Sequence, residues 1–162
     1  MLPLLLGIAI TLLDQVTKVL VDKNFDLYDS IPIVPGLFDL RYIRNTGAAW
    51  GLFAGGQFWL AMLSVAVLLA LVIFRRSFFA DGLTDRVAFG LIIGGIIGNF
   101  IDRVRLEYVI DFMDFHWRGH HFPAFNVADA SICCGVALYM VAQILMARRR
   151  QRHESECAGV PR

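Results

Sequence analysis

Four long apolar stretches, with the charged residues collected between them, constrain this chain more than any other feature. They cover about residues 2–20, 57–74, 87–103 and 127–147. A helix needs about 20 mostly apolar residues to cross a bilayer, and 57% of this chain is hydrophobic. The pattern therefore predicts one polytopic membrane domain over residues 1–147, with four transmembrane helices. Residues 148–162 are polar and begin with a basic run, and we expect them to form a disordered tail.

The segments between the apolar stretches predict a smaller amount of other structure. Within residues 24–50, Phe38 to Ile43 alternates apolar and polar side chains, which is typical of a half-buried strand or hairpin. Residues 108–117 are amphipathic and aromatic, and Trp and Tyr favour the boundary between membrane and water. The predicted fold class is an all-α membrane protein with four transmembrane helices, a small extracytoplasmic β-region at about residues 24–50 and an interfacial helix.

Glycine lines one face of the third apolar stretch. Gly90, Gly94 and Gly98 recur every four residues, and Gly95 adjoins them. Small residues at this spacing allow another helix to approach closely. We therefore expect this face to pack against neighbouring helices.

Basic residues mark one side of the predicted domain. Arg75, Arg76 and Arg86 lie around the loop between the second and third stretches, and a run of arginines follows the fourth. Because basic residues near short loops gather on the cytoplasmic side, this loop and both termini are predicted to be cytoplasmic. The polar residues at the opposite ends of the stretches then gather on the outer side, which predicts one polar site built by several helices. These residues are Asp14, Lys18, Asn45, Asn99, Asp102, Arg103, Asp111, Asn126 and Asp129.

Asp129 gives the strongest indication of a functional site. It is the one charged residue in the last apolar run, and a carboxylate near hydrocarbon costs about 2.5–3.5 kcal/mol, so we expect it to face protein or water. Two neighbouring carboxyl groups do not both ionise easily, so one keeps a proton while the other can take a proton from water, as hydrolysis requires. We favour Asp111 as the partner of Asp129. Asp102 is the rival, although Arg103 and Arg105 are available to neutralise it.

Other classes of function find less support. The net charge of +1 and the lack of a basic stripe in the sequence argue against a nucleic-acid partner. The three cysteines have neither metal-binding spacing nor the pattern of a disulfide framework. His116 and His120 have the spacing of a zinc site on a helix, but Gly119 disfavours a helix there. We therefore predict no metal and no cofactor.

Five short blocks contain most of the polar residues of the predicted site. They are Asp14-Gln15-x-Thr17-Lys18, Asn45-Thr46-Gly47-Ala48-Ala49, Gly94-Gly95-x-x-Gly98-Asn99-x-x-Asp102-Arg103, Val109-Ile110-Asp111-Phe112 and Phe125-Asn126-Val127-Ala128-Asp129. Together, and in this order, they resemble the motifs of the bacterial prolipoprotein signal peptidases, or signal peptidase II. They span nearly the whole chain apart from the tail. Trp50 departs from the family pattern, in which Phe is more usual.

The resemblance implies an aspartic endopeptidase of the bacterial inner membrane, with its site near the periplasmic face. Such an enzyme removes the signal peptide from a diacylglyceryl-modified prolipoprotein by cutting just before the lipidated cysteine. It implies that Asp111 and Asp129 are catalytic and that the outer β-region forms a cradle over the site. The predicted partners are this substrate and membrane lipid, and we expect a monomer. We predict substrate-binding or supporting roles for Asp14, Lys18, Asn45, Gly47, Asn99, Asp102, Arg103 and Asn126.

Two other functions stay open at this point. A small transporter or proton relay would use the same carboxylates to carry ions, but its polar groups should follow the full depth of the membrane rather than gather at one side. A structural membrane subunit would explain the glycine face. It would leave the clustered aspartates and carboxamides unexplained.

Overall fold

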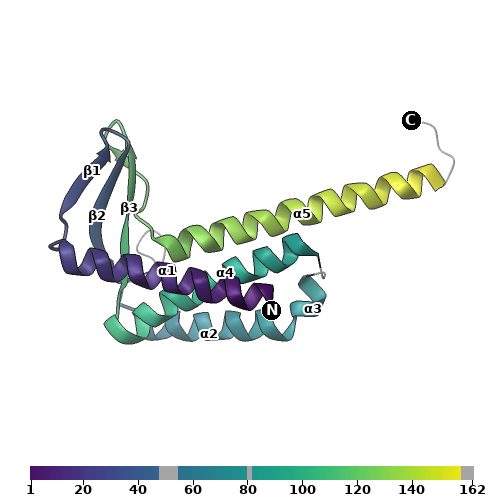
Figure 1. Cartoon of the computed structure of the whole chain (residues 1–162), viewed down its shortest axis with the longest axis horizontal. Helices are drawn as coiled ribbons and strands as arrows, with labels where there is room; N and C mark the ends of the chain where they lie inside the picture. Colours follow the sequence, from purple (N-terminus) through teal and green to yellow (C-terminus); the bar gives the residue numbers. More distant parts are fainter. Residues whose placement is uncertain (48–54, 80–81, 158–162) are drawn as a thin grey trace.

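The computed structural model describes residues 1–47, 55–79 and 82–157 of the chain. In this part of the chain helices dominate, and a small sheet stands at one end of them (Figure 1). The helices are α1 (Leu2–Asn24), α2 (Gln57–Ile73), α3 (Arg75–Phe78), α4 (Leu83–Leu106) and α5 (Val127–Cys157). The strands are β1 (Ser30–Val34), β2 (Phe38–Asn45), β3 (Val109–Trp117) and β4 (His120–His121).

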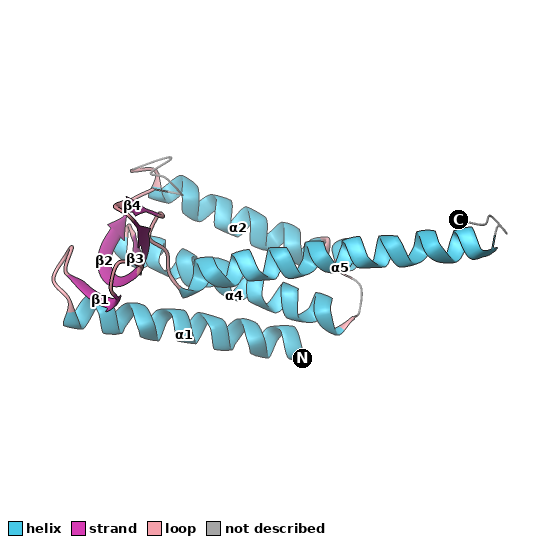
Figure 2. Cartoon of the chain, turned by 90° about the horizontal axis from the view of Figure 1, so that it is seen from above, coloured by secondary structure: helices cyan, strands magenta, loops and turns pink. Residues whose placement is uncertain are grey.

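Helix α4 forms the centre of the bundle, because its glycines bring it close to α1 and α5. A Cβ atom on Gly94 would lie 2.7 Å from the Gly7 carbonyl oxygen of α1. On another side of α4, a side chain on Gly95 would overlap the Ala128 carbonyl oxygen of α5. The predicted packing role of the glycine face is thus confirmed. Helix α2 also packs on α4, and it lies apart from α1 (Figure 2).

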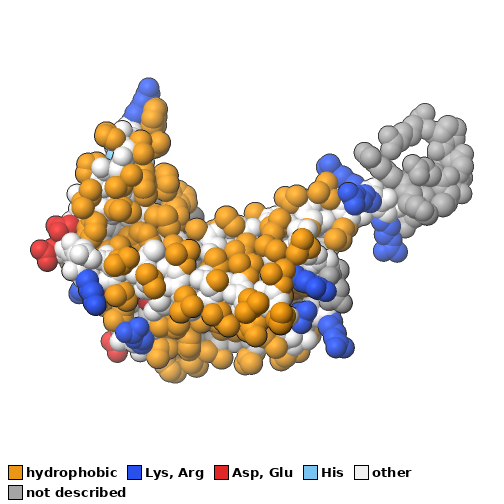
Figure 3. Space-filling model, in the orientation of Figure 1, with side chains coloured by type: hydrophobic (Ala, Val, Ile, Leu, Met, Phe, Trp, Pro, Cys, Tyr) orange, Lys and Arg blue, Asp and Glu red, His pale blue; other side chains and the backbone are white. Residues whose placement is uncertain are grey.

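Three helices are long and apolar enough to cross a membrane: α1, α4 and the part of α5 from Val127 to Gln151. Helix α2 is apolar too, but its 17 residues fall at the lower end of the usual range of about 17–25. The fourth predicted span therefore stays a prediction. Apolar side chains cover the visible face of the bundle, as expected for helices surrounded by lipid (Figure 3).

The sheet is antiparallel, with the strand order β1-β2-β3-β4. The hairpin predicted within residues 24–50 is present as β1 and β2, while residues 48–50 of that region, Trp50 among them, lie outside the described part. Strand β3 pairs with β2 so that Asp111 stands opposite Ile43, and Val109 opposite Asn45. Because Asp111 lies two residues beyond Val109 on β3, this register places Asn45 and Asp111 on the same face of the sheet as diagonal neighbours.

Two predictions about local structure differ from what is observed. The segment in which an interfacial helix was expected forms strand β3, because pairing with β2 satisfies its backbone and buries Val109 to Phe112. Helix α5 continues to Cys157, so residues 148–157 are helical rather than disordered. Arginine, glutamine and glutamate favour helix, which allows a long helix to extend beyond its apolar part. Residues 158–162 lie outside the described part.

Candidate active site

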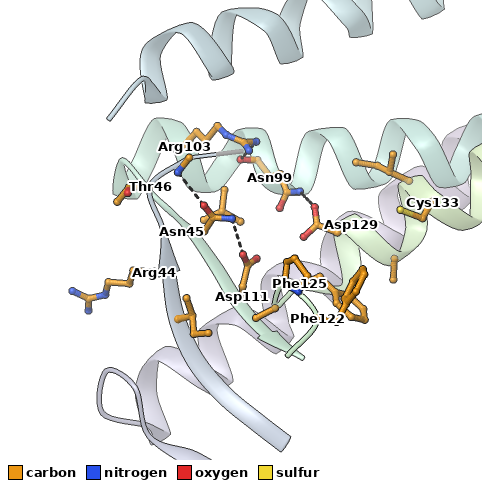
Figure 4. Close-up of a pocket in the computed structure, with 17 residues that line it drawn as sticks. Arg44, Asn45, Thr46, Asn99, Arg103, Asp111, Phe122, Phe125, Asp129 and Cys133 are labelled. Carbon is orange, nitrogen blue, oxygen red and sulfur yellow. Dashed lines mark hydrogen bonds between the residues drawn. The ribbon is translucent and has the colours of Figure 1, made fainter. Parts of the chain in front are cut away.

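A cavity of about 740 Å³ lies where the sheet meets α4 and the start of α5. Asp111 reaches it from β3, and Asp129 reaches it from the first turn of α5 (Figure 4). Residues far apart in the sequence therefore share one concave site, as the predicted gathering of polar residues requires. The predicted site residues that line the cavity are Asn45, Gly47, Asn99, Arg103, Asp111 and Asp129.

Asn126 connects the two aspartates. Its side-chain Nδ2 donates a hydrogen bond to Asp111 Oδ1 over 2.7 Å, and its backbone N–H donates to Asp129 Oδ2 over 3.3 Å. Its Oδ1 in turn accepts a bond from the Asp129 backbone N–H at 2.9 Å, as an N-cap side chain does. Because Asn126 is fully buried, these bonds fix how the two carboxylates stand relative to each other.

Each carboxylate also accepts a bond from a second carboxamide. Asn45 Nδ2 donates to Asp111 Oδ2 over 2.9 Å, and Asn99 Nδ2 donates to Asp129 Oδ1 over 2.7 Å (Figure 4). The Gly47 backbone N–H donates to Asn45 Oδ1 over 2.9 Å, which determines which end of the Asn45 side chain faces Asp111. The three asparagines thus hold the pair from β2, α4 and the start of α5.

A buried charge cluster lies behind Asn99. Lys18 Nζ lies 2.8 Å from Asp14 Oδ2 and 2.9 Å from Asp102 Oδ2, and all three side chains are almost completely buried. The same ammonium group donates to Asn99 Oδ1 over 2.9 Å. Because Lys18 occupies the oxygen of this carboxamide, the nitrogen is turned toward Asp129. The cluster therefore supports the site without lining it.

This cluster also bears on the rival pairing of Asp102 with Asp129. Asp102 is neutralised by Lys18, from another helix, rather than by its neighbours in sequence, Arg103 and Arg105, which were the expected partners. Its Oδ2 accepts a bond from the Ile110 backbone N–H as well, and its side chain does not line the cavity. The geometry therefore favours Asp111 as the partner of Asp129.

The pKa of Asp111 is raised to about 7. Burial is the largest cause, because this side chain is only 2% exposed, and the nearby carboxylate of Asp129 adds to it. The hydrogen bonds from Asn45 and Asn126 act in the opposite direction, since they stabilise the ionised form. The pair can therefore hold one proton near neutral pH, which gives it an acid and a base together, and that proton belongs to the pair rather than to one residue.

Several apolar residues of the cavity were not identified from the sequence. Phe122 and Phe125 line it from the segment before α5, and Ile132 and Cys133 line it from α5 itself. From the sequence, Cys133 was not assigned to the site. Its distance of four residues from Asp129 places both on one helix face, and this signal was present in the sequence.

His116, His120 and His121 lie on the sheet, and none of the three lines the cavity. His116 Nε2 lies 3.2 Å from Asp39 Oδ1, and His121 Nδ1 lies 2.9 Å from Asp114 Oδ1. Among the described residues, no group of three histidine, cysteine or acidic side chains is arranged to hold a metal ion. His116 and His120 were considered as a zinc pair on a helix, but both lie on strands.

The fold and the site together define a class: a helical membrane protein with an aspartate pair, Asp111 buried and Asp129 half-buried, at one end of the bundle, arranged for acid–base chemistry. The profile of the signal peptidase (SPase) II family matches residues 6–145. The chain therefore belongs to this family, as the five sequence blocks predict.

Curated relatives and solved structures agree. The chain is 46% identical over 144 residues to the lipoprotein signal peptidase of Geobacter metallireducens, a match that covers 86% of this chain and 88% of that protein. It is 37% identical to the lipoprotein signal peptidase of Bacillus subtilis, covering 95% and 100% of the two chains. A solved structure described as a bacterial membrane enzyme superposes with a TM-score of 0.79 at 36% identity, covering 88% of this chain and 87% of that one.

Proposed function

We propose that this chain is an aspartic endopeptidase of the bacterial inner membrane that removes the signal peptide from diacylglyceryl-modified prolipoproteins, cutting just before the lipidated cysteine. Membership of the signal peptidase II family supports the peptidase activity, and the names of its relatives support the substrate class. The observation that carries the mechanism is the convergence of Asp111 and Asp129 on one cavity, connected through Asn126.

The proposed reaction uses one ionised and one protonated carboxyl group. A water molecule gives a proton to the ionised carboxylate while its oxygen attacks the scissile carbonyl carbon. The protonated carboxyl group gives its proton to the carbonyl oxygen, and a neutral tetrahedral diol forms. In the second step the diol returns a proton to the newly ionised carboxylate, the other carboxyl group protonates the leaving nitrogen, and the C–N bond breaks. Both aspartates are then restored to their starting states.

The surrounding residues have proposed supporting roles. The carboxamides of Asn45, Asn99 and Asn126 hold the carboxylates in place, so little reorganisation is needed during reaction. Arg103 lines the cavity, and in the described part of the chain its Nε has no hydrogen-bond partner. We assign this guanidinium to binding a carbonyl group of the substrate.

The proposed orientation places the sheet and the cavity at the periplasmic face. The start of α1, the C-terminal end of α5, and the ends of α2 and α4 nearest Arg75 and Arg86 lie at the opposite end of the bundle (Figure 1). Basic side chains are visible at both ends in Figure 3, but at this end they adjoin the short loop between α2 and α4 and follow the apolar part of α5, which supports its assignment to the cytoplasm. The apolar wall formed by Phe122, Phe125 and Ile132 suits a lipidated substrate that enters from the membrane.

A gel-shift assay tests the proposal. Asp111→Asn and Asp129→Asn proteins are incubated in detergent micelles with a diacylglyceryl-modified precursor, and loss of the signal peptide is followed on a gel. The cleavage rate of both variants should fall by at least about 10³-fold, because one aspartate beside one asparagine cannot complete the proton transfers. Asp114→Asn is a matched control, because Asp114 is equally buried on β3 but does not line the cavity.

Three outcomes separate the possible functions. Full cleavage by either active-site variant would refute the dyad. Cleavage of the non-lipidated precursor at the same rate would refute the substrate class. Proton flux in vesicles that depends on Asp129, without any cleavage by the wild type, would favour the proton relay.

A further inference from the structure

A second cavity, of about 350 Å³, lies between α1, α2 and α4 toward the end of the bundle opposite the sheet. Apart from Arg75, the side chains of its wall are apolar, and it contains no group used in the proposed reaction. The residues that carry the argument are Leu4, Ile8, Val72, Phe89, Ile93 and Ile97.

The shape of this cavity follows from the helices that form it. Helices α1 and α2 both pack on α4 but stand apart from each other (Figure 2). The cavity is a slot between them over α4. Phe89 and Ile97 mark its extent along α4, and eight residues of helix correspond to about 12 Å. The slot is therefore long and narrow, as a hydrocarbon chain is.

A cationic group stands at one end of the slot. Arg75 lines it, and the guanidinium of Arg75 lies 5.6 Å from the centre of the Phe89 ring. Arg76 follows directly in sequence. Because α2 ends just before these residues, they fall where lipid headgroups lie in the proposed orientation.

We propose that this slot binds one acyl chain of an anionic phospholipid from the cytoplasmic leaflet, with the lipid phosphate beside Arg75. The apolar wall accounts for the acyl chain, and the arginine accounts for the preference for negative charge. A signal peptide fits less well, because its basic amino-terminal region would meet arginine. A second copy of this chain in the same orientation also fits less well, because it would bring its own arginines to the same level as Arg75 and Arg76. The proposal uses the orientation given above but not the peptidase mechanism.

Native mass spectrometry of the full chain tests this proposal. The protein is released from mixed micelles that contain equal amounts of phosphatidylglycerol and phosphatidylcholine. The wild type should retain one phosphatidylglycerol in preference to phosphatidylcholine by about fivefold, the effect of one arginine near an anionic lipid. Arg75→Gln should remove the preference, and Arg75→Lys should keep it. Ile8→Trp, which fills the slot, should reduce retention of both lipids.

Matched variants make the result specific. Arg148→Gln removes a cation from α5 rather than from the slot and should leave the preference unchanged. Ile144→Trp is a control for Ile8→Trp, because both isoleucines are 49% exposed and Ile144 lies on α5. Equal retention of the two lipids by the wild type, or a preference that survives both Arg75→Gln and Ile8→Trp, would overturn the proposal. So would a dimer that Ile8→Trp dissociates, or loss of precursor cleavage in Ile8→Trp with unchanged lipid retention. None of the lipid measurements depends on the aspartate pair.

Discussion

Replacing Asp111 with asparagine should abolish cleavage and, in the same protein, weaken the dependence of stability on pH. The substitution keeps the shape of the side chain but removes a buried carboxyl group that is 2% exposed. It also turns an amide nitrogen toward Asn45 or Asn126, both of which donate to this position. That mismatch costs about 1 kcal/mol, but the cost does not change with pH.

The magnitude follows from the pKa of Asp111, which is about 7 in the folded protein against 3.8 for the ordinary group. Between these values the folded protein binds more protons than the unfolded chain, so the free energy of unfolding falls as the pH rises. From about pH 5.5 to about pH 8, this carboxyl group alone removes about 2 kcal/mol of stability. For a chain of this size, that corresponds to about 4–8 °C in Tm.

The assay is thermal unfolding in detergent, followed by intrinsic fluorescence at several pH values between these limits. The fall in Tm over this interval should be smaller in Asp111→Asn than in the wild type by about 4–8 °C. Comparing the two proteins cancels the groups that titrate equally in both. The difference between the two falls in Tm measures proton uptake by the Asp111–Asp129 pair as a whole, because the two residues share the proton.

Asp39→Asn is the control for this measurement. Asp39 is only half-buried on β2, and its bond with His116 lowers the pKa of its carboxyl group, so removing it should not relieve the fall in Tm at high pH. If the wild type and Asp111→Asn lose the same stability over the interval, then Asp111 does not take up a proton near neutral pH. The proposed sharing of one proton by the pair would then be refuted.

Three further substitutions test the framework around the pair. Lys18→Met leaves two buried carboxylates without their cation and should lower the free energy of unfolding by about 3–5 kcal/mol, measured as Tm in detergent. Gly95→Val pushes α5 away from α4 and should reduce cleavage strongly, because Asp129 moves with α5; gel-shift rates and Tm measure it. Asn126→Ala removes the residue that connects the carboxylates and should reduce the cleavage rate by about 10²-fold in the same assay.

Two controls accompany these variants. Lys23→Met removes an exposed lysine from the end of α1 and should leave Tm within about 1 °C of the wild type. Gly7→Ala adds a methyl group whose nearest neighbour lies at 3.5 Å, an ordinary contact, and should be tolerated. A Lys18→Met protein as stable as Lys23→Met, or a Gly95→Val enzyme as active as Gly7→Ala, would contradict the packing described here. An Asn126→Ala enzyme of unchanged rate would contradict the role given to that residue.

The sequence was most informative where structure depends on local composition. The apolar stretches predicted the helices that are long enough to cross a membrane, because the hydrocarbon core selects helices by length and hydropathy. The glycine spacing predicted the packing face of α4, since close approach of helices needs small residues. Asp129 was identified for the same kind of reason, as one carboxylate in an apolar run.

Local patterns were least informative where a segment takes its structure from its neighbours. Residues 109–117 were expected within an interfacial helix, but the exposed edge of β2 gives their backbone a partner and makes them a strand. The helical extension of α5 to Cys157 was missed because a charged, polar segment can be either helix or disordered tail. Local composition does not separate these alternatives.

The sequence by itself thus determined the kind of protein, the gathering of its polar residues at one end of the bundle, and the two aspartates of interest. Only the tertiary structure decided how those residues are paired. Lys18, rather than Arg103 or Arg105, neutralises Asp102, although α1 and α4 are far apart in the chain. The physical reason is that hydropathy acts on each segment separately, whereas hydrogen bonds and ion pairs depend on the distance and direction between segments once they are packed.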